Sequence, residues 1–325
     1  MRILLIGEES AALQVLKAIA GTGYEIVAVM TSLSPKGDLS IAAAANRLAY
    51  AIWPAQRVKD PHFGVEVKSA RIDIILNVHS RYIVQKEVLL APRIGAFNMH
   101  PGPLPEYAGL NTVSWAIYRG ESNYGVTVHW MSQEIDAGDI AYEKRFSVDE
   151  NETPISLIHK CVIHGVPLIL QMLETAFVNP HAIPRIKQQL QRRRYFGKQI
   201  PQNGQLSWKA PARDVVNFVR ACDYSPYLSP WGHPTTRWQG YDVGIARAVR
   251  THKACNEAPG VVGQCDTAGA LIACADEWVL VQRLKIASRS VMPHLILTRG
   301  GQMSHSRSDE LRGTYCDQGV GPLTA

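Results

Sequence analysis

The first hundred residues alternate between short apolar runs and stretches of helical periodicity, and this alternation limits the fold more than any other feature. Residues 2–6 and 26–31 are apolar runs of strand length, and residues 11–20 between them have apolar side chains at helical spacing. Four more segments continue the pattern, with helical spacing at 41–51 and 63–70 and apolar strands at 72–77 and 94–99. This order predicts an α/β fold class with a parallel sheet that helices cover on both faces.

The rest of the chain has patterns typical of a hairpin, a long helix and short strands. Residues 124–131 alternate polar and apolar side chains, and 140–148 form the expected partner strand across Asp136-Ala137-Gly138. Residues 153–177 have helical periodicity. One further helix and five short strands are predicted, at 212–221, 235–238, 241–248, 260–264, 270–273 and 278–284. Short strands separated by turns favour a small β-barrel.

The length of 325 residues exceeds the usual size of one domain. We expect four parts: a first domain at 1–190, an exposed linker at 191–204, a barrel-like domain at 205–300 and a flexible tail at 301–325. The segment Met1 to Gly7 is too short for a signal sequence, and no run of about 18 apolar residues is apparent. We therefore expect a cytoplasmic protein with no membrane partner.

The net charge of +6 is unevenly distributed. Residues 1–190 hold 17 Lys or Arg against 18 Asp or Glu, whereas residues 191–325 hold 17 against 10. A basic excess can attract nucleic acid or an anionic carrier, but Gln191-Arg192-Arg193-Arg194 is interpreted more simply as a solvated linker.

Two cofactor classes are disfavoured by the sequence. The six cysteines contain no C-x-x-C pair, and His252 and Cys255 are followed by no second pair at zinc-ligand spacing, so no metal is expected. Gly7 follows the first strand, but Glu8, Glu9 and Ser10 replace the G-x-G-x-x-G pattern, and two carboxylates would repel a pyrophosphate.

Asn98 and His100 end an apolar strand, and Asp136 follows 36 residues after His100. Because side chains in a strand alternate between faces, Asn98 and His100 point the same way while Met99 points into packing. A substrate could contact both polar groups, and the trio fits transfer of an acyl group to an amine. The amide can donate to a developing oxyanion, the imidazole can also carry protons, and the carboxylate can orient the imidazole or take the amine proton through a water.

Each of the three residues also has a simpler interpretation. Asn98 could cap the strand, His100 could be an interior histidine, and Asp136 could start a turn. Their combination with the rigid loop Pro101-Gly102-Pro103-Leu104-Pro105 favours a functional site, because open α/β sheets bind ligands at the carboxyl ends of their strands.

The segments 97–109 (FNMHPGPLPEYAG) and 134–140 (EIDAGDI) together resemble the folate-dependent formyltransferase family, whose pattern is N-x-H, then L-P-x-Y-x-G, then D-x-G. Residues 193–220 resemble the start of the C-terminal domain of methionyl-tRNA formyltransferase. The resemblance implies an enzyme with a Rossmann-like domain followed by a small, OB-like barrel. It further implies that Asn98, His100 and Asp136 are catalytic and that the cosubstrate is N10-formyltetrahydrofolate or another one-carbon-loaded tetrahydrofolate.

The same resemblance implies contacts to the folate and to the acceptor. The folate-binding candidates, mostly through their backbone, are Arg81, Tyr82, Ile83, Leu104, Ile135 and Asp139. The acceptor-binding candidates are Tyr107, Gly109 and Asn111. The sequence leaves open whether two copies of the chain form a homodimer.

Two departures from the family concern the acceptor. The tRNA enzymes have a long basic insertion after the second strand, whereas residues 32–40 are short with one Lys and one Asp, so tRNA is disfavoured. The formyltransferase half of the polymyxin-resistance enzyme, which acts on a nucleotide-linked amino sugar, has arginines after the loop tyrosine, whereas Tyr107 is followed by Ala108 and Gly109. A nucleotide-sugar acceptor stays open, but this anchor for it is missing. Residues 102–116 are most similar to modules of specialised-metabolite and antibiotic biosynthesis, which favours the amine of an amino acid, a peptide, an aminoglycoside-like metabolite or an amino sugar.

Three alternatives stay open. The one-carbon unit could be formimidoyl, because both units present an sp2 carbon to the amine. Water could be the acceptor, although hydrolases of the family usually have a further domain in front, and here the first strand begins at Arg2. A non-catalytic folate-binding protein is a third alternative, which the intact trio disfavours.

Overall fold

The computed structural model describes residues 1–32, 40–287 and 289–304. Contacts divide the chain into two compact units: the first holds residues 1–113, 122–149 and 156–197, and the second holds 114–121, 150–155 and the residues from 198 on. The division therefore differs from a single boundary at 190, because two short segments of the N-terminal half pack with the second unit. Of residues 32–40, which bear on the missing basic insertion, all but the first and the last lie outside the described residues.

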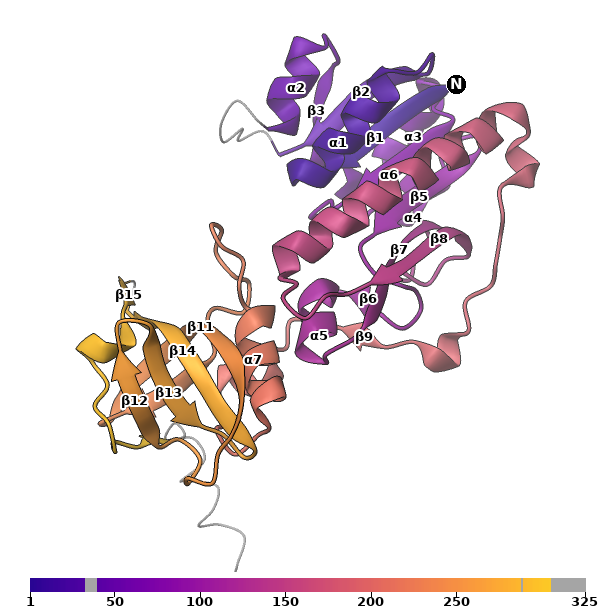
Figure 1. The fold of residues 1–325 in the computed structure, drawn as a ribbon. Helices are drawn as coiled ribbons and strands as arrows, with labels where there is room; N and C mark the ends of the chain where they lie inside the picture. The colour runs from indigo at the N-terminus through magenta and orange to yellow at the C-terminus, as the bar shows by residue number, and fades with distance from the viewer. Residues whose placement is uncertain (33–39, 288, 305–325) are drawn as a thin grey trace, which may run out of the picture. The chain divides into compact units, whose positions relative to one another are not determined.

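The first unit is built on a seven-stranded sheet with the order β3-β2-β1-β4-β5-β7-β8 (Figure 1). The strands are β1 (Arg2–Gly7), β2 (Glu25–Thr31), β3 (Ile52–Pro54), β4 (Ile74–Val78), β5 (Gly95–His100), β7 (Asn123–Trp130) and β8 (Ile140–Ser147). The strands from β3 to β5 in this order pair in parallel. Strand β7 pairs antiparallel with β5, and β8 pairs antiparallel with β7. The predicted α/β sheet and its hairpin are confirmed.

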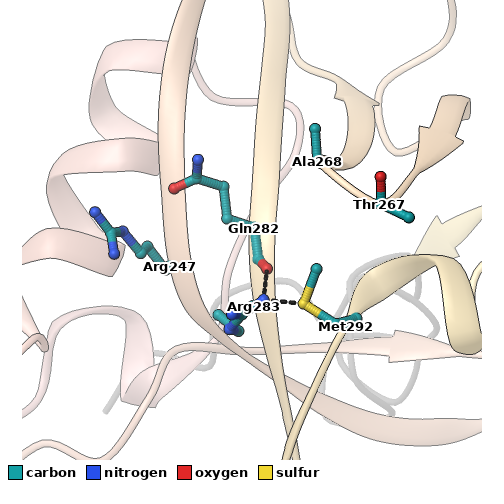
Figure 2. Close-up of a pocket in the computed structure, with 6 residues that line it drawn as sticks. All are labelled: Arg247, Thr267, Ala268, Gln282, Arg283 and Met292. Atoms are coloured by element: carbon teal, nitrogen blue, oxygen red, sulfur yellow. Dashed lines mark hydrogen bonds between the residues drawn. The ribbon is translucent and has the colours of Figure 1, made fainter.

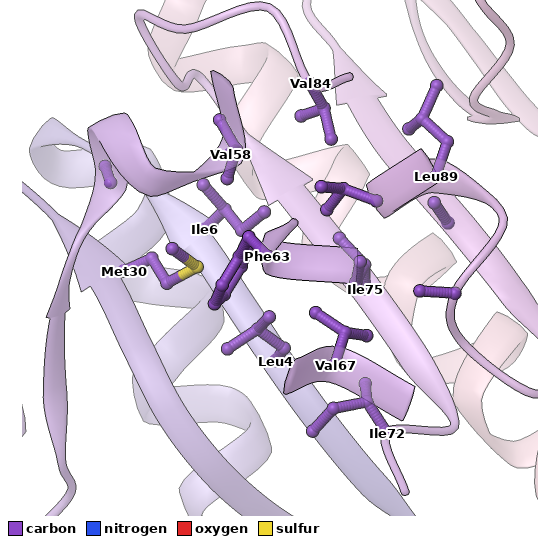
Figure 3. Packing of buried hydrophobic residues seen from close by; sticks show 14 of the residues in the cluster. Leu4, Ile6, Met30, Val58, Phe63, Val67, Ile72, Ile75, Val84 and Leu89 are labelled. Atoms are coloured by element: carbon purple, nitrogen blue, oxygen red, sulfur yellow. The ribbon is translucent and has the colours of Figure 1, made fainter. Parts of the chain in front are cut away.

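One face of this sheet carries the core cluster shown in Figure 3. Leu4 and Ile6 of β1 and Ile75 of β4 pack there against Phe63 and Val67. The helices of the unit are α1 (Glu9–Ala20), α2 (Ile41–Arg47), α3 (Phe63–Ser69), α4 (Lys86–Leu89) and α6 (Pro154–Val178), with 3-10 turns at Ala55–Lys59, Pro180–Ala182 and Leu190–Arg192. Helix α5 (Thr112–Tyr118) is divided between the units, and β3, α4 and α5 are short elements that the sequence did not predict.

Helix α6 packs closely on the opposite face. A Cβ atom on Gly165 would lie 2.5 Å from the Met99 sulfur and 3.1 Å from Val126 Cγ2, so glycine lets the helix approach β5 and β7. An 18-residue window of α6 has a mean hydropathy of 1.6, with 39% of it buried, so by length and composition alone this helix could cross a membrane. Each such window also contains Lys160 or Glu174, so α6 is not the uninterrupted apolar run that the sequence was expected to lack. The close contact at Gly165 shows that one face of this helix packs on β5 and β7.

The second unit is a curled antiparallel sheet with the order β12-β13-β14-β11-β10-β16, to which β15 adds beside β14. Its elements are α7 (Ala212–Ala221), β10 (Thr235–Trp238), β11 (Tyr241–Ala254), β12 (Val262–Asp266), β13 (Gly269–Ala273), β14 (Glu277–Ile286), β15 (Arg289–Val291) and β16 (Met303–Ser304), with 3-10 turns at Pro201–Gly204 and Pro293–Leu295. Val262 N donates to Gly301 O at 2.9 Å, and Met303 N donates to Gly260 O at 2.9 Å. These bonds join the two end strands, so the predicted small barrel is confirmed.

Two predicted boundaries were wrong. The expected tail begins too early, because Met303–Ser304 forms β16 beside Arg237–Trp238, while residues 305–325 lie outside the described part. The expected linker also begins too early. Strand β9 (Tyr195–Phe196) pairs with β6 (Ala108–Gly109), so residues 191–197 are part of the first unit. In both places backbone pairing with a segment far away in the sequence orders residues that have no periodicity of their own.

Candidate functional site

Strand β5 places Asn98 and His100 at the carboxyl end of the parallel strands. In register, Asn98 lies beside Asn77 of β4 on one side and His129 of β7 on the other. The intervening Met99 is buried and lies against the side of Gly165, on the opposite face, as the period of two predicts. Polar side chains therefore replace apolar ones toward the carboxyl ends of β4 and β5, and this is where the site lies.

The Asn98 amide is held from three sides. Asn77 Nδ2 donates to Asn98 Oδ1 at 2.8 Å, which fixes the orientation of the amide. Asn98 Nδ2 lies 3.1 Å from His129 Nε2 and makes only a long contact of 3.5 Å with Asp136 Oδ1. One Nδ2 hydrogen is therefore without a short hydrogen bond to these neighbours, so the amide could donate to a ligand oxygen.

The His100 ring is buried, with 4% of the residue exposed. Its Nε2 lies 2.6 Å from the Tyr107 carbonyl oxygen, which can only accept, so Nε2 donates a proton there. Its Nδ1 lies 3.5 Å from Asp136 Oδ2. Burial lowers the pKa of His100 below its ordinary value of 6.5, although the Asp136 carboxylate and the Tyr107 carbonyl oppose this. The neutral ring thus has its free nitrogen beside a carboxylate that would stabilise it if it took up a proton.

Asp136 joins the site from the loop after β7, with 9% of the residue exposed. Gly109 N donates to its Oδ2 at 2.9 Å, and His129 Nε2 lies 3.5 Å from its Oδ1. Burial alone would raise the pKa of Asp136, but the charge that His100 carries when protonated, the hydrogen bond of His129 and its charge when protonated, and the Gly109 N–H hold the pKa of Asp136 well below its ordinary value. The carboxylate therefore stays ionised, and the structure brings all three predicted catalytic residues together.

The loop that carries Asp136 is fastened by a segment from the end of the first unit. Gln188 Nε2 donates to the carbonyl oxygens of Asp136 and Gly138, at 2.9 and 2.6 Å. Arg193 donates to Ile135 O at 2.7 Å and pairs with Glu134 at 3.2 Å. Arg193 is therefore an anchor of the site loop, which corrects the interpretation of 191–194 as a solvated run of charge.

Two of the acceptor-binding candidates, Tyr107 and Gly109, contact the triad through their backbone. The Tyr107 ring is buried and stacks on Phe196, and its carbonyl accepts from His100. Gly109 has φ +95°, and a Cβ atom there would lie 2.2 Å from Phe196 O, so this position needs glycine. Asn111 has φ +53°. Contact of these residues with an acceptor stays a prediction.

The folate-binding candidates occupy several environments. Leu104 is buried and its N–H donates to Thr127, while Tyr82 packs against the core cluster. Arg81 lies at the surface 3.6 Å from Glu9, and Asp139 pairs with Lys187 at 3.2 Å. Two further candidates, Ile83 and Ile135, are 64% and 38% exposed.

Three residues at this site were not predicted from the sequence: Asn77, His79 and His129. His79 directly follows β4, and the other two flank Asn98. A polar residue at the carboxyl end of a parallel strand was the signal that identified Asn98, and the same signal at the end of β4 would have identified Asn77 and His79. His129 could be found only from the hairpin register.

Hollows also occur in the second unit. Figure 2 shows one of about 280 Å³, where Arg283 donates to the Gln282 carbonyl oxygen at 3.3 Å and contacts the Met292 sulfur. Another, of about 530 Å³, is lined by residues that include His233 and Lys285. Neither is lined by a predicted site residue.

Within the described ranges, no group of three or more His, Cys, Asp or Glu side chains could hold a metal ion. The five cysteines in this part of the chain are free thiols: Cys161, Cys222, Cys255, Cys265 and Cys274. Burial raises the pKa of Cys222 and of Cys274 to about 12, so these thiols are inert packing groups.

Comparison with protein families decides the class of this site. The model of the formyl transferase family matches residues 1–172, and the model of the formyl transferase C-terminal domain matches residues 199–300. The chain belongs to the formyl transferase family. In this formyl transferase, the first match contains Asn98, His100 and Asp136, and the second covers most of the barrel.

Solved structures share the fold of this formyl transferase. WlaRD, a sugar 3N-formyl transferase crystallised with dTDP and 5-N-formyl-THF, has a TM-score of 0.68 at 19% identity, covering 86% of this chain and 96% of WlaRD. The N-formyltransferase from Helicobacter canadensis, in complex with folinic acid and dTDP-3-aminofucose, has a TM-score of 0.67 at 19% identity, covering 86% of this chain and 98% of that protein.

HypX from Aquifex aeolicus, in complex with tetrahydrofolic acid, has a TM-score of 0.61 at 20% identity. The match covers 91% of this formyl transferase and 47% of HypX, so the chain spans about half the length of HypX. At these identities the likeness concerns the fold.

Proposed function

We propose that this protein transfers a formyl group from N10-formyltetrahydrofolate to the amino group of a small metabolite, with Asn98, His100 and Asp136 as catalytic residues. The observation that carries the proposal is the meeting of these three side chains at the carboxyl end of β5, in a chain of the formyl transferase family. The fit of a folate is supported by Ile83 and Ile135, large apolar side chains left exposed on the two loops expected to hold it.

N10-formyltetrahydrofolate would supply an electrophilic carbonyl carbon. The Asn98 amide, which Asn77 orients, would donate to the carbonyl oxygen as it becomes negative, and losing one such donor typically costs about 3 kcal/mol in barrier. His100 would take up and release a proton at Nδ1, and Asp136 would stabilise the charged ring. Together the three residues would serve the oxygen and the protons of one transfer.

The acceptor we propose is an amine of an amino acid, a peptide, an aminoglycoside-like metabolite or an amino sugar. Among the proteins with this fold, WlaRD is a sugar 3N-formyl transferase, and the Helicobacter canadensis N-formyltransferase was crystallised with dTDP-3-aminofucose. This supports a small-molecule amine and makes amino sugars the first class to test. Exclusion of tRNA, a role in specialised-metabolite biosynthesis, a cytoplasmic location and a homodimer stay predictions.

The test is incubation of the full chain with formyltetrahydrofolate labelled in the formyl carbon and a panel of amines from these four classes. Labelled formyl on one acceptor, detected by mass spectrometry, supports the proposal. Formation of labelled formate without any formylated amine would indicate a hydrolase instead. A labelled formimidoyl donor in a parallel reaction distinguishes the other one-carbon unit.

The His100→Ala variant separates an enzyme from a folate-binding protein. Folinic acid binding, measured by calorimetry, should persist in the variant because the folate contacts are expected elsewhere, and turnover should fall by about 10²- to 10⁴-fold. Equal turnover of the variant and the wild type would contradict the proposed mechanism.

A further inference from the structure

His79, directly after the end of β4, is a polar residue that the proposed mechanism does not use. Its Nε2 atom is buried and has no hydrogen bond partner among the described residues. Nδ1 likewise makes no hydrogen bond to them, but it is not a buried atom, and the residue as a whole is partly exposed. The other two imidazoles of the site each have a carbonyl partner, Tyr107 O for His100 and Trp130 O for His129.

The backbone of His79 is also unusual. It has φ +54°, in the left-handed region that side-chain residues rarely adopt. Such conformations cost about 1–3 kcal/mol and cluster at active sites and ligand-binding positions. Ten other non-glycine residues of the described chain share this region, so the conformation is compatible with a functional position and does not mark one by itself.

The position of His79 in the sheet is a further observation. The strand order reverses between β1 and β4, and Glu8 N donates to Val78 O where these two strands end. Open α/β sheets bind ligands in the crevice at this reversal. Val78 of β4 pairs with Met99 of β5, so the residues that follow them, His79 and His100, lie at neighbouring positions of the sheet.

The protonation of His79 follows from these surroundings. A proton on the buried Nε2 would meet no acceptor, whereas Nδ1 is not buried and can donate to water or to a ligand, so the proton is favoured on Nδ1. Burial, followed by the charge of His100, lowers the pKa of His79 to about 4. The ring is then neutral near pH 7, too weak as a base but able to donate a hydrogen bond.

We propose that His79 is a further catalytic residue, whose neutral ring donates a hydrogen bond from Nδ1 to the carbonyl oxygen of the one-carbon unit as that oxygen becomes negative. The inference rests on the proposed function. In the transfer, the acceptor nitrogen bonds to the carbonyl carbon, the bond from that carbon to N10 breaks, the acceptor nitrogen loses one proton and N10 gains one. His79 keeps its own proton throughout and acts beside Asn98.

The kinetic test compares His79→Phe, which keeps a ring without a donor, with His79→Gln, which keeps a donor. For His79→Phe we expect kcat to fall by about 10²- to 10³-fold with little change in the KM of the formyl donor. His79→Gln should recover at least about tenfold of that loss. The matched control is His62→Phe, since the His62 side chain is 93% exposed. Wild-type kcat in His79→Phe, or a change in KM alone, would overturn the inference.

Nitrogen-15 NMR of histidine-labelled wild type tests the ring directly and needs no acceptor. At pH 7, the His79 signals should show the neutral form protonated at Nδ1, and the Nδ1–H signal should shift when folinic acid binds. A charged ring, a proton on Nε2 or no shift on binding would overturn the inference. Because this experiment uses the wild type, it decides the question even if a variant fails to fold. If the wild type formylates no amine, the proposed function fails. The same signals still show whether the Nδ1–H of His79 responds to a bound folate.

Discussion

At the scale of single residues, Asp136 connects the separate parts of the site. It receives the Gly109 N–H and lies 3.5 Å from the rings of His100 and His129, so one carboxylate faces two imidazoles and a backbone donor. These partners stabilise its ionised form despite burial. Removing the charge should therefore affect the protonation of His100 more than the packing of the loop.

The Asp136→Asn variant should lower turnover by about 10²- to 10⁴-fold, because the amide cannot stabilise a protonated His100. Initial rates with labelled formyl donor measure the effect. The control is Asp60→Asn, an exposed carboxylate that hydrogen-bonds His62 and lies outside the site. Turnover of Asp136→Asn within twofold of the control would contradict the role of the charge.

The same variant allows a test of pH dependence. The pKa of Asp136 is lowered in the folded state, so its contribution to the free energy of unfolding is complete above about pH 4 and is lost as the pH falls toward the folded pKa. The difference in free energy of unfolding between wild type and Asp136→Asn should therefore stay constant above about pH 5 and shrink as the pH falls below about 4. Urea unfolding at several pH values measures it, and a constant difference would contradict the lowered pKa.

At the scale of elements, the loop between β7 and β8 is fixed by a close approach and by hydrogen bonds from residues 188–193. A Cβ atom on Gly138 would lie 1.8 Å from the Trp130 carbonyl oxygen, which belongs to the backbone and cannot rotate away. Gly138→Ala should therefore lower the free energy of unfolding by about 1–3 kcal/mol and reduce turnover, because the loop must shift. Urea unfolding and rates are compared with Gly23→Ala, where nothing lies within 4 Å of the added atom. Equal stability of the two variants would contradict the close approach.

The hydrogen bonds of Gln188 can be tested separately from this contact. Gln188→Leu removes both donations to the loop carbonyls, each worth about 0.5–1.5 kcal/mol, so we expect roughly tenfold lower turnover while the sheet stays folded. The matched control is Gln189→Leu at an exposed neighbouring position. Circular dichroism checks the fold, and unchanged rates in Gln188→Leu would show that the loop is held by other contacts.

At the scale of the whole molecule, each of the two units is held together by contacts between residues that lie far apart in the sequence. In the second unit, Gly260 has φ +92°, and a Cβ atom there would lie 2.3 Å from Met303 O. Gly260→Ala should therefore open the junction of β12 and β16. Hydrogen exchange should lose protection at Val262 and Met303 and keep it at Leu5 in the first unit, and unchanged protection at Met303 would contradict the closure.

Much of the fold and the central site residues could be predicted from the sequence. Apolar periodicity predicted β1, α1 and β2, because burial requires such spacing in each element separately. The N-x-H strand end predicted that Asn98 and His100 share a face, since alternation is a local property of a strand. Asp136 was predicted from its turn and from the family pattern, and the structure places it beside both.

The remainder was decided only by the tertiary structure. The register of β5 with β4 and β7 brought Asn77 and His129 to Asn98, and the return of the chain brought Gln188 and Arg193 to the loop of Asp136. The order at residues 191–197 and 301–304 likewise depends on partner strands. Spacing along the chain determines which face a side chain takes, but which distant segment supplies its partner depends on how whole elements pack.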